Sequence, residues 1–338
     1  MNDANVRVGI FAASSPVPEI ELAAGLEHLR AGGFEPVVHA QVPKRHFTFA
    51  GSDDERAAAI CDFAYDDSID VLWAARGGYG AGRLLPILDR LTAHRGAPPP
   101  KGKLIVGYSD VTVLHEYARS RWGWSTLHAP MPSASGFPRL DVMEWRAIVA
   151  YVRGRPADPP WAHATLRWLT APPAGDIEAE LIGGNLALWS SLAGTPYAQP
   201  ARGKILFLED TDEPFYRIDR MMTQLAQSGA LDGAAAIVLG DFTQCRDESA
   251  QCLADAATGT KRPLRKTYEQ PEAWQHIFAD LGHHLGVPVA QGLPVGHGPH
   301  YAPLPLGARY ALTTNGQLSL VEWDWVMFSH SWGTDRHR

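Results

Sequence analysis

Short apolar runs alternate with longer amphipathic segments through the first 150 residues of the chain. Brief runs rich in β-branched residues indicate buried strands, and apolar positions spaced three or four residues apart after a polar cap indicate helices. Strands are predicted over 6–12, 69–76 and 104–106, each followed by a turn and a helix. This alternation is typical of a mostly parallel, wound α/β sheet, whose ligand sites lie at the carboxyl ends of the strands.

The composition changes at a proline-rich stretch, "GRPADPPWAHATLRWLTAPPAG", at 154–175. Proline-rich stretches of this kind are typical of connections between folded units. We therefore expect an N-terminal α/β domain over 1–155, a linker over 156–175, and a strand-rich, mixed α/β domain over 176–338.

The second half of the chain carries several apolar runs separated by turns, together with two helical patterns over 216–231 and 272–286. Asn315-Gly316 between two apolar runs is a strong hairpin signal. The segment 246–272 is polar and poorly patterned, so it is predicted to be a mobile loop.

Charge and cysteine content narrow the possible partners. The net charge is −7 with no basic cluster, so neither nucleic acid nor an anionic membrane is an expected partner. No long apolar span and no N-terminal signal pattern is seen, so a cytoplasmic protein is expected. The three cysteines, Cys61, Cys245 and Cys252, suggest no disulfide framework and no zinc pair, and no metal site is predicted.

The stretch "LIVGYSDVTVLHEYA" places Ser109 between a predicted strand and a predicted helix. The serine, or Asp110 after it, is suited to cap that helix by accepting a backbone N–H bond. Alternatively, Gly107 permits a sharp bend that exposes the Ser109 hydroxyl as a nucleophile elbow. The hydrolase pattern G-x-S-x-G is only half present, because Val111 stands where the second glycine would be. Both interpretations remain open from this stretch alone.

The glycine-rich segment "RGGYGAGR" follows another predicted strand. Gly78 and Gly80 make a G-x-G, but Arg83 stands where the third glycine of a dinucleotide fingerprint would be, so no such cofactor is expected. The glycines either permit a tight turn or let bare N–H groups approach a ligand oxygen as half of an oxyanion hole. Arg76 is suited to hold an anionic substrate group or an internal carboxylate.

Two further residues have the chemistry that an activated serine needs. Glu209 ends the apolar run "KILFL", where a carboxylate is unusual unless paired or functional, although the acidic residues after it also fit a solvated turn. His297 lies between two glycines in "GLPVGHGPHYAPLPLG", with His300 as a rival. A zinc site at these two histidines is a weak alternative, since no H-E-x-x-H or cysteine set accompanies them.

Six segments in order resemble the LD-carboxypeptidase family of serine peptidases, which also includes the microcin C self-immunity peptidases. The resemblance runs from "VGIFAASSPVP" to near Val321 and therefore covers almost the whole chain. The segments are "ARGGYGAGRLLPILD", "VGYSDVTVLH", "ELIGGNLALWSSLAGTPYA", "GKILFLEDTDEPFYRIDRMMTQL", "IVLGDF" and "GLPVGHGPHYAPLPLGARYAL".

The resemblance implies a Ser–Glu–His triad with the serine on the first domain and its partners on the second. Position by position, Ser109 matches the nucleophile, Glu209 the carboxylate and His297 the base. The N–H groups of Asp110 and Gly78 match the oxyanion hole. The candidates for holding substrate carboxylates or amides are Arg76, Arg83 and Asn185.

The resemblance also implies the reaction: hydrolysis of the bond between an L-residue and a C-terminal D-residue in small cell-wall-derived peptides, through an acyl-enzyme, without metal or cofactor, in a homodimer. An alternative within the family is cleavage of peptidyl-nucleotide toxins, with a base stacking on an aromatic ring. The candidate rings are Trp161, Trp168 and Trp189. An alternative from another class is a non-catalytic ligand-binding protein, in which Ser109 only caps a helix.

Overall fold

The computed structural model describes residues 6–100, 102–155, 159–246 and 273–325. Its first sheet has six strands in the order β11-β5-β4-β3-β1-β2. The first five strands in the chain run parallel, and β11 joins the edge antiparallel to β5. Their bounds are β1 Val6–Phe11, β2 Phe34–Val38, β3 Val71–Ala74, β4 Leu104–Gly107, β5 Ser125–His128 and β11 Leu304–Leu306.

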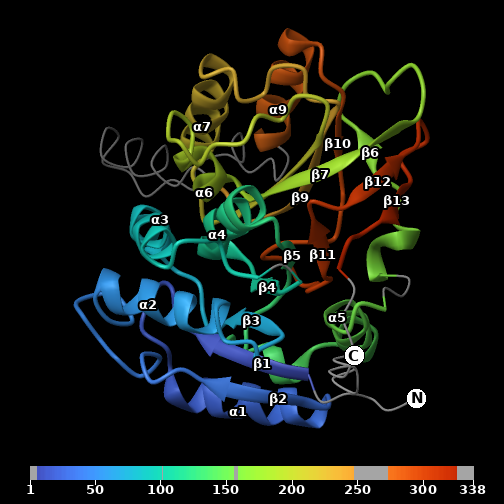
Figure 1. Cartoon of the computed structure of the whole chain (residues 1–338). Helices are drawn as coiled ribbons and strands as arrows, with labels where there is room; N and C mark the ends of the chain where they lie inside the picture. The colour runs from blue at the N-terminus through green and yellow to red at the C-terminus, as the bar shows by residue number, and fades with distance from the viewer. Residues whose placement is uncertain (1–5, 101, 156–158, 247–272, 326–338) are drawn as a thin grey trace, which may run out of the picture.

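Helices cover both faces of this sheet, because its strands are apolar on both sides (Figure 1). One face packs against α2 (Asp53–Ala64), α3 (Leu85–His94) and α4 (Thr112–Tyr117), and the other packs against α1 (Glu19–Ala31) and α5 (Val142–Val152). Short helical turns complete the layer: η1 Ala81–Leu84, η2 Ser109–Val111, η3 Ala118–Trp122, η4 Phe137–Arg139 and η5 Pro160–His163.

The second sheet has seven strands in the order β13-β12-β7-β8-β9-β10-β6. Its centre is parallel, from β7 to β10, and its edges are antiparallel, so it is a mixed sheet. The strands are β6 Arg167–Trp168, β7 Ile177–Asn185, β8 Ile205–Thr211, β9 Ala236–Thr243, β10 Val289–Gln291, β12 Arg309–Leu312 and β13 Leu318–Glu322. One face packs against α6 (Leu186–Ser191), α7 (Phe215–Gln227) and α9 (Ala273–Leu285).

The two halves meet around α4, which packs against α6 and β7 of the second half (Figure 1). A charged network reinforces this contact: Arg119, after α4, pairs with Glu116 on α4 and with Glu180 on β7. The helix α4 is therefore held between the two sheets. Its position brings the carboxyl end of β4 towards the second half of the chain.

The fold class expected from the sequence is confirmed: a wound parallel sheet followed by a strand-rich, mixed α/β unit. The Asn315-Gly316 hairpin joins β12 to β13, and Gly316 has a φ of 81°. The segment expected to be a linker, 156–175, also contributes to the second sheet. Its residues Arg167–Trp168 pair with β10 as an edge strand. The predicted mobile loop over 246–272 lies, apart from Arg246, outside the described residues.

Candidate functional site

Ser109 occupies a strained turn between β4 and α4. Its φ of 61° is in the left-handed region, which a residue with a side chain adopts at a cost. Tyr108 before it is extended, and the chain turns directly into η2 and then α4. Gly107 has no room for a side chain here, because a Cβ would lie 2.9 Å from the Val111 methyl groups. The half-buried serine hydroxyl is thus presented at the carboxyl end of a central strand.

The glycine loop after β3 runs directly past this serine. A Cβ built on Gly77 would lie 3.1 Å from Ser109 Oγ, so the backbone of Gly77 is next to the hydroxyl. Gly78 has a φ of 115°, and a Cβ there would collide with Ser15. Both glycines therefore suit the close approach of the loop, Gly77 to Ser109 and Gly78 to Ser15.

The Asp110 side chain ties three segments together beneath the serine. Its carboxylate accepts hydrogen bonds from Ser14 Oγ at 2.5 Å and from the Ala81 backbone N–H at 2.7 Å. Burial raises the pKa of Asp110, and the two hydrogen bonds oppose that shift. The side chain of Asp110 thus holds the turns after β1 and β3 against the turn at Ser109. Its backbone N–H remains available for a role at the reacting centre.

Glu209 and His297 form a close pair on the second sheet. Glu209 lies on β8, is fully buried, and accepts a bond from His297 Nδ1 to Oε2 at 2.7 Å. The same oxygen accepts the His297 backbone N–H at 3.2 Å. Gly296 has a φ of 137°, and a Cβ there would lie 2.9 Å from Glu209. The glycine before the histidine therefore lets the loop fold over the carboxylate.

The pKa values of this pair reflect mutual stabilisation. Burial would raise the pKa of Glu209, but His297 and His128 outweigh it and lower that pKa to about 2. Burial would likewise lower the pKa of His297, but the charge and hydrogen bond of Glu209 outweigh it, so the pKa is raised. Glu209 is thus an anion at neutral pH, and its charge favours a protonated His297.

Tyr108 connects the His297–Glu209 pair to the turn that carries Ser109. The Tyr108 ring lies 4.6 Å from the His297 ring, centroid to centroid, at 39°. Because Tyr108 precedes Ser109, this contact places the imidazole beside the elbow. In the described part of the chain no hydrogen bond joins Ser109 to His297. The structure therefore brings the three predicted residues to one region, through the His297–Glu209 bond and the contact of His297 with the neighbour of Ser109.

The other predicted residues contact the protein itself. Arg76 donates to the Pro16 carbonyl at 2.8 Å, and Arg83 pairs with Asp53 through two nitrogens. Asn185 caps α6, with its amide nitrogen on Asp210. His300, the rival to His297, lies 3.5 Å from Glu144 instead of contacting Glu209.

The aromatic rings considered for base stacking also belong to the protein's own packing. Trp161 and Trp189 are buried in the cores of the second half, and Trp168 donates its indole N–H to the Thr314 carbonyl. Trp161 and Trp189 therefore have no exposed face for a nucleobase to stack on, whereas Trp168 is half-buried.

Three residues near the pair escaped the sequence analysis: Tyr108, His128 and Glu144. His128 ends β5 and its Nε2 lies 3.8 Å from Glu209 Oε1. Glu144 accepts the Tyr301 backbone N–H at 3.0 Å, which anchors the loop that carries His297 to α5. A detectable signal existed for His128 alone, because a histidine closing an apolar strand is placed at the functional edge of a sheet.

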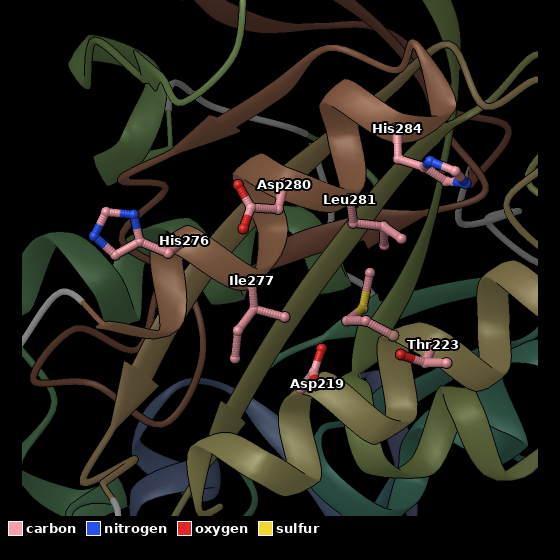
Figure 2. A pocket seen from close by; sticks show the side chains of 8 residues that line it. Asp219, Thr223, His276, Ile277, Asp280, Leu281 and His284 are labelled. Atoms are coloured by element: carbon pink, nitrogen blue, oxygen red, sulfur yellow. The ribbon is translucent and has the colours of Figure 1, made fainter.

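The cavities in the described part of the protein include the following two. One of about 690 Å³ borders the His297 loop and is lined by Gly136, Arg139, Leu140, Asp141, Glu144, Pro299, His300 and Tyr301. The other, of about 440 Å³, separates α7 from α9. Figure 2 shows His276, Asp280 and His284 projecting from α9 and Asp219 and Thr223 from α7. This second cavity contains none of the predicted site residues.

The described residues lack both a metal-binding cluster and a membrane-spanning helix. No group of three or more His, Cys, Asp or Glu side chains there is arranged to hold a metal ion. No helix among them is long and apolar enough to cross a membrane.

A wound α/β sheet that presents a serine on a left-handed turn, with a histidine–carboxylate pair beside it, is the arrangement of a serine hydrolase. Residues 8–129 match the family model of the LD-carboxypeptidase N-terminal domain, and residues 178–312 match that of the C-terminal domain. The chain therefore belongs to the LD-carboxypeptidase family, and it is a serine-type carboxypeptidase.

Named relatives agree with this assignment. The chain is 37% identical to a putative carboxypeptidase of Streptomyces coelicolor, with 93% of each chain covered. It is 32% identical to a probable murein peptide carboxypeptidase of Bacillus subtilis, covering 93% of this chain and 91% of the relative. The crystal structure of muramoyltetrapeptide carboxypeptidase from Oxalobacter formigenes superposes with a TM-score of 0.72 at 29% identity, covering 94% of this chain and 99% of that one.

Proposed function

We propose that Ser109, His297 and Glu209 form the catalytic triad of an enzyme that releases a C-terminal D-amino acid from cell-wall-derived peptides. The observation that carries the proposal is the meeting of the strained Ser109 turn with the His297–Glu209 pair through the Tyr108 ring. The substrate class follows the names of relatives, a murein peptide and a murein tetrapeptide carboxypeptidase.

The chemistry assigns each group one task. Because Glu209 holds Nδ1, the other ring nitrogen of His297 is the one left to take the Ser109 proton. The serine oxygen then attacks the carbonyl carbon of the L-residue, and the imidazolium returns the proton to the departing amine of the D-residue. Water, activated by the same imidazole, cleaves the acyl-enzyme and regenerates the serine.

The oxyanion formed in each step needs donors on the side of the glycine loop. The N–H groups of Gly78 and Asp110 are the proposed donors, since the loop lies against Ser109 and Asp110 follows it directly. Losing one such donor typically costs ~3 kcal/mol of transition-state stabilisation. Arg76, Arg83 and Asn185 remain proposed substrate contacts, and substrate binding would have to compete with the protein partners that these side chains already have.

The cellular setting and organisation are part of the same proposal. A peptidase of this specificity would act in the cytoplasm on recycled cell-wall fragments, as a homodimer. The two-domain division at 1–155 and 176–338, with a connection over 156–175, places the nucleophile on one unit and its partners on the other. The strand β11 crosses that division, since it belongs to the first sheet in space and to the second half in sequence.

The test is a direct comparison of substrates. A cell-wall tetrapeptide ending in a D-residue should lose that residue, whereas the same peptide ending in the L-enantiomer should not. An aminoacyl-nucleotide analogue cleaved faster than the tetrapeptide would instead favour the peptidyl-nucleotide alternative. A serine-directed phosphonate should label Ser109, as read by mass spectrometry. Absence of both turnover and label in folded protein would favour a ligand-binding protein and overturn the proposal.

A further inference from the structure

The two oxygens of the Glu209 carboxylate have unequal partners. Oε2 accepts both bonds from His297, one from the backbone and one from the ring. Oε1 is buried and has no hydrogen-bond partner in the described part of the chain. A buried carboxylate oxygen with no donor is costly, because the anion has lost its water on that side without gaining a hydrogen bond.

The atom that faces this oxygen is Nε2 of His128, at 3.8 Å. This nitrogen is also buried and also without a partner among the described residues. Two complementary polar atoms therefore face each other, each lacking the bond that the other can supply. A shift of less than one ångström would bring them to hydrogen-bonding distance.

The ring of His128 is held in a fixed orientation. It packs edge-on against Tyr108, at 5.7 Å, and against Phe207, at 5.5 Å. Its backbone is locked between β4 and β11, opposite Gly107 and Leu304. The side chain is nearly inaccessible, so the orientation of Nε2 towards Glu209 comes from the packing and not from solvent.

We propose that His128 is a positioning residue: in the active enzyme its Nε2 donates a hydrogen bond to Oε1 of Glu209, so that two imidazoles hold the carboxylate. The inference rests on the proposed triad, in which Glu209 orients His297. With Oε1 bound, the carboxylate cannot rotate away from Nδ1 of His297, and the base keeps the tautomer that leaves its other nitrogen free for Ser109.

The charges around this pair set the sign of the pH effect. Glu209 is surrounded by His297, His128, Tyr108 and the carboxyl groups of Asp210 and Asp241, and His128 also lies near His115. A donor on Oε1 draws negative charge away from His297 and so opposes protonation of that ring. Without the donor, the pair should take up a proton at higher pH, which moves the acid limb of the activity profile upward.

Two substitutions separate this role from mere packing. His128→Gln keeps an N–H donor but loses the ring, and His128→Phe keeps the ring but loses the donor. A positioning role predicts a fall in kcat of about 10- to 100-fold for His128→Phe, with KM nearly unchanged and the acid limb shifted to higher pH. His128→Gln should recover much of kcat and the original limb. The reverse order, with His128→Phe the more active and the limb unmoved, would overturn the proposal.

A double substitution tests whether the effect passes through Glu209. In a Glu209→Gln background, His128→Phe should lower kcat by less than about twofold further, because the carboxylate it serves is gone. An undiminished effect in that background would place His128 in another role and count against the proposal.

The tautomer of His128 gives a test on the unsubstituted protein, which does not depend on the folding of any variant. Nitrogen NMR of the unsubstituted protein, with His128 assigned through its backbone, should show a hydrogen on Nε2. A bare Nε2 would overturn the proposal. Failure of the proposed function is read separately, from the unsubstituted enzyme: no turnover of the tetrapeptide would reject the function while the tautomer result still stands.

Discussion

His297 and Glu209, 88 positions apart in the sequence, share two hydrogen bonds to one oxygen. Oε2 of Glu209 accepts one bond from the ring Nδ1 of His297 and one from its backbone N–H. The backbone bond fixes where the loop lies, and the ring bond fixes how the imidazole faces. A single carboxylate thus sets both the position and the tautomer of the proposed base, and most of the behaviour expected of this enzyme follows from that relationship.

Removing the charge of Glu209 should shift the acid limb of the pH–activity profile to lower pH. The negative carboxylate raises the pKa of His297, so Glu209→Gln should let the imidazole lose its proton at lower pH. The acid limb of kcat/KM then shifts to lower pH, while kcat falls by about 10²–10⁴-fold because the tautomer is no longer held. A pH series on both proteins measures this, and an acid limb that stays in place would show that Glu209 does not control His297.

Replacing the nucleophile should remove activity and reveal the strain of the turn. Ser109→Ala and Ser109→Gly should each lower kcat by at least about 10³-fold. Since Ser109 has a φ of 61°, the glycine variant should be more stable than the alanine variant by about 1 kcal/mol. Urea unfolding of the pair gives that difference. Equal stabilities would mean that the left-handed conformation carries no cost here.

Crowding the nucleophile from the glycine loop should harm catalysis more than stability. A methyl group at Gly77 would lie 3.0 Å from Ser109 Cβ and 3.1 Å from its Oγ, so Gly77→Ala should displace the hydroxyl and lower kcat by about 10- to 100-fold. Gly82→Ala, in the turn η1 that follows this loop, is the control, because a Cβ there meets nothing within 4 Å. Similar kinetics for the two variants would contradict the close approach of Gly77 to Ser109.

Loosening the His297 loop from α5 should lower both stability and activity. Glu144 accepts the Tyr301 N–H at 3.0 Å and the Asp141 N–H at 3.3 Å. Glu144→Ala removes both acceptors and should cost about 1–2 kcal/mol of unfolding free energy, with a several-fold loss of kcat. Glu144→Gln retains a carbonyl acceptor and should behave more nearly like the unsubstituted enzyme. Denaturation and steady-state kinetics on the three proteins compare these outcomes.

Local pattern was enough to predict much of the fold. Apolar runs and glycine turns predict β1, β3 and β4, and Asn315-Gly316 predicts the β12–β13 hairpin, because these features depend on neighbours in the chain. The sequence pattern predicts a linker where the edge strand β6 lies, since a strand of two residues near prolines has no detectable period. The pairing of β11 with β5 likewise has no local signal, because it joins strands about 180 positions apart.

The sequence by itself determined the chemistry available: a serine at a strand-to-helix turn, a carboxylate closing an apolar run, and a histidine between glycines, each set by local conformational preference and burial. Only the tertiary structure decided which oxygen of Glu209 meets His297, that Gly77 lies against Ser109, and that His128 faces the other oxygen. Those facts depend on contacts between segments distant in the chain, and such contacts are fixed by packing and not by local propensity.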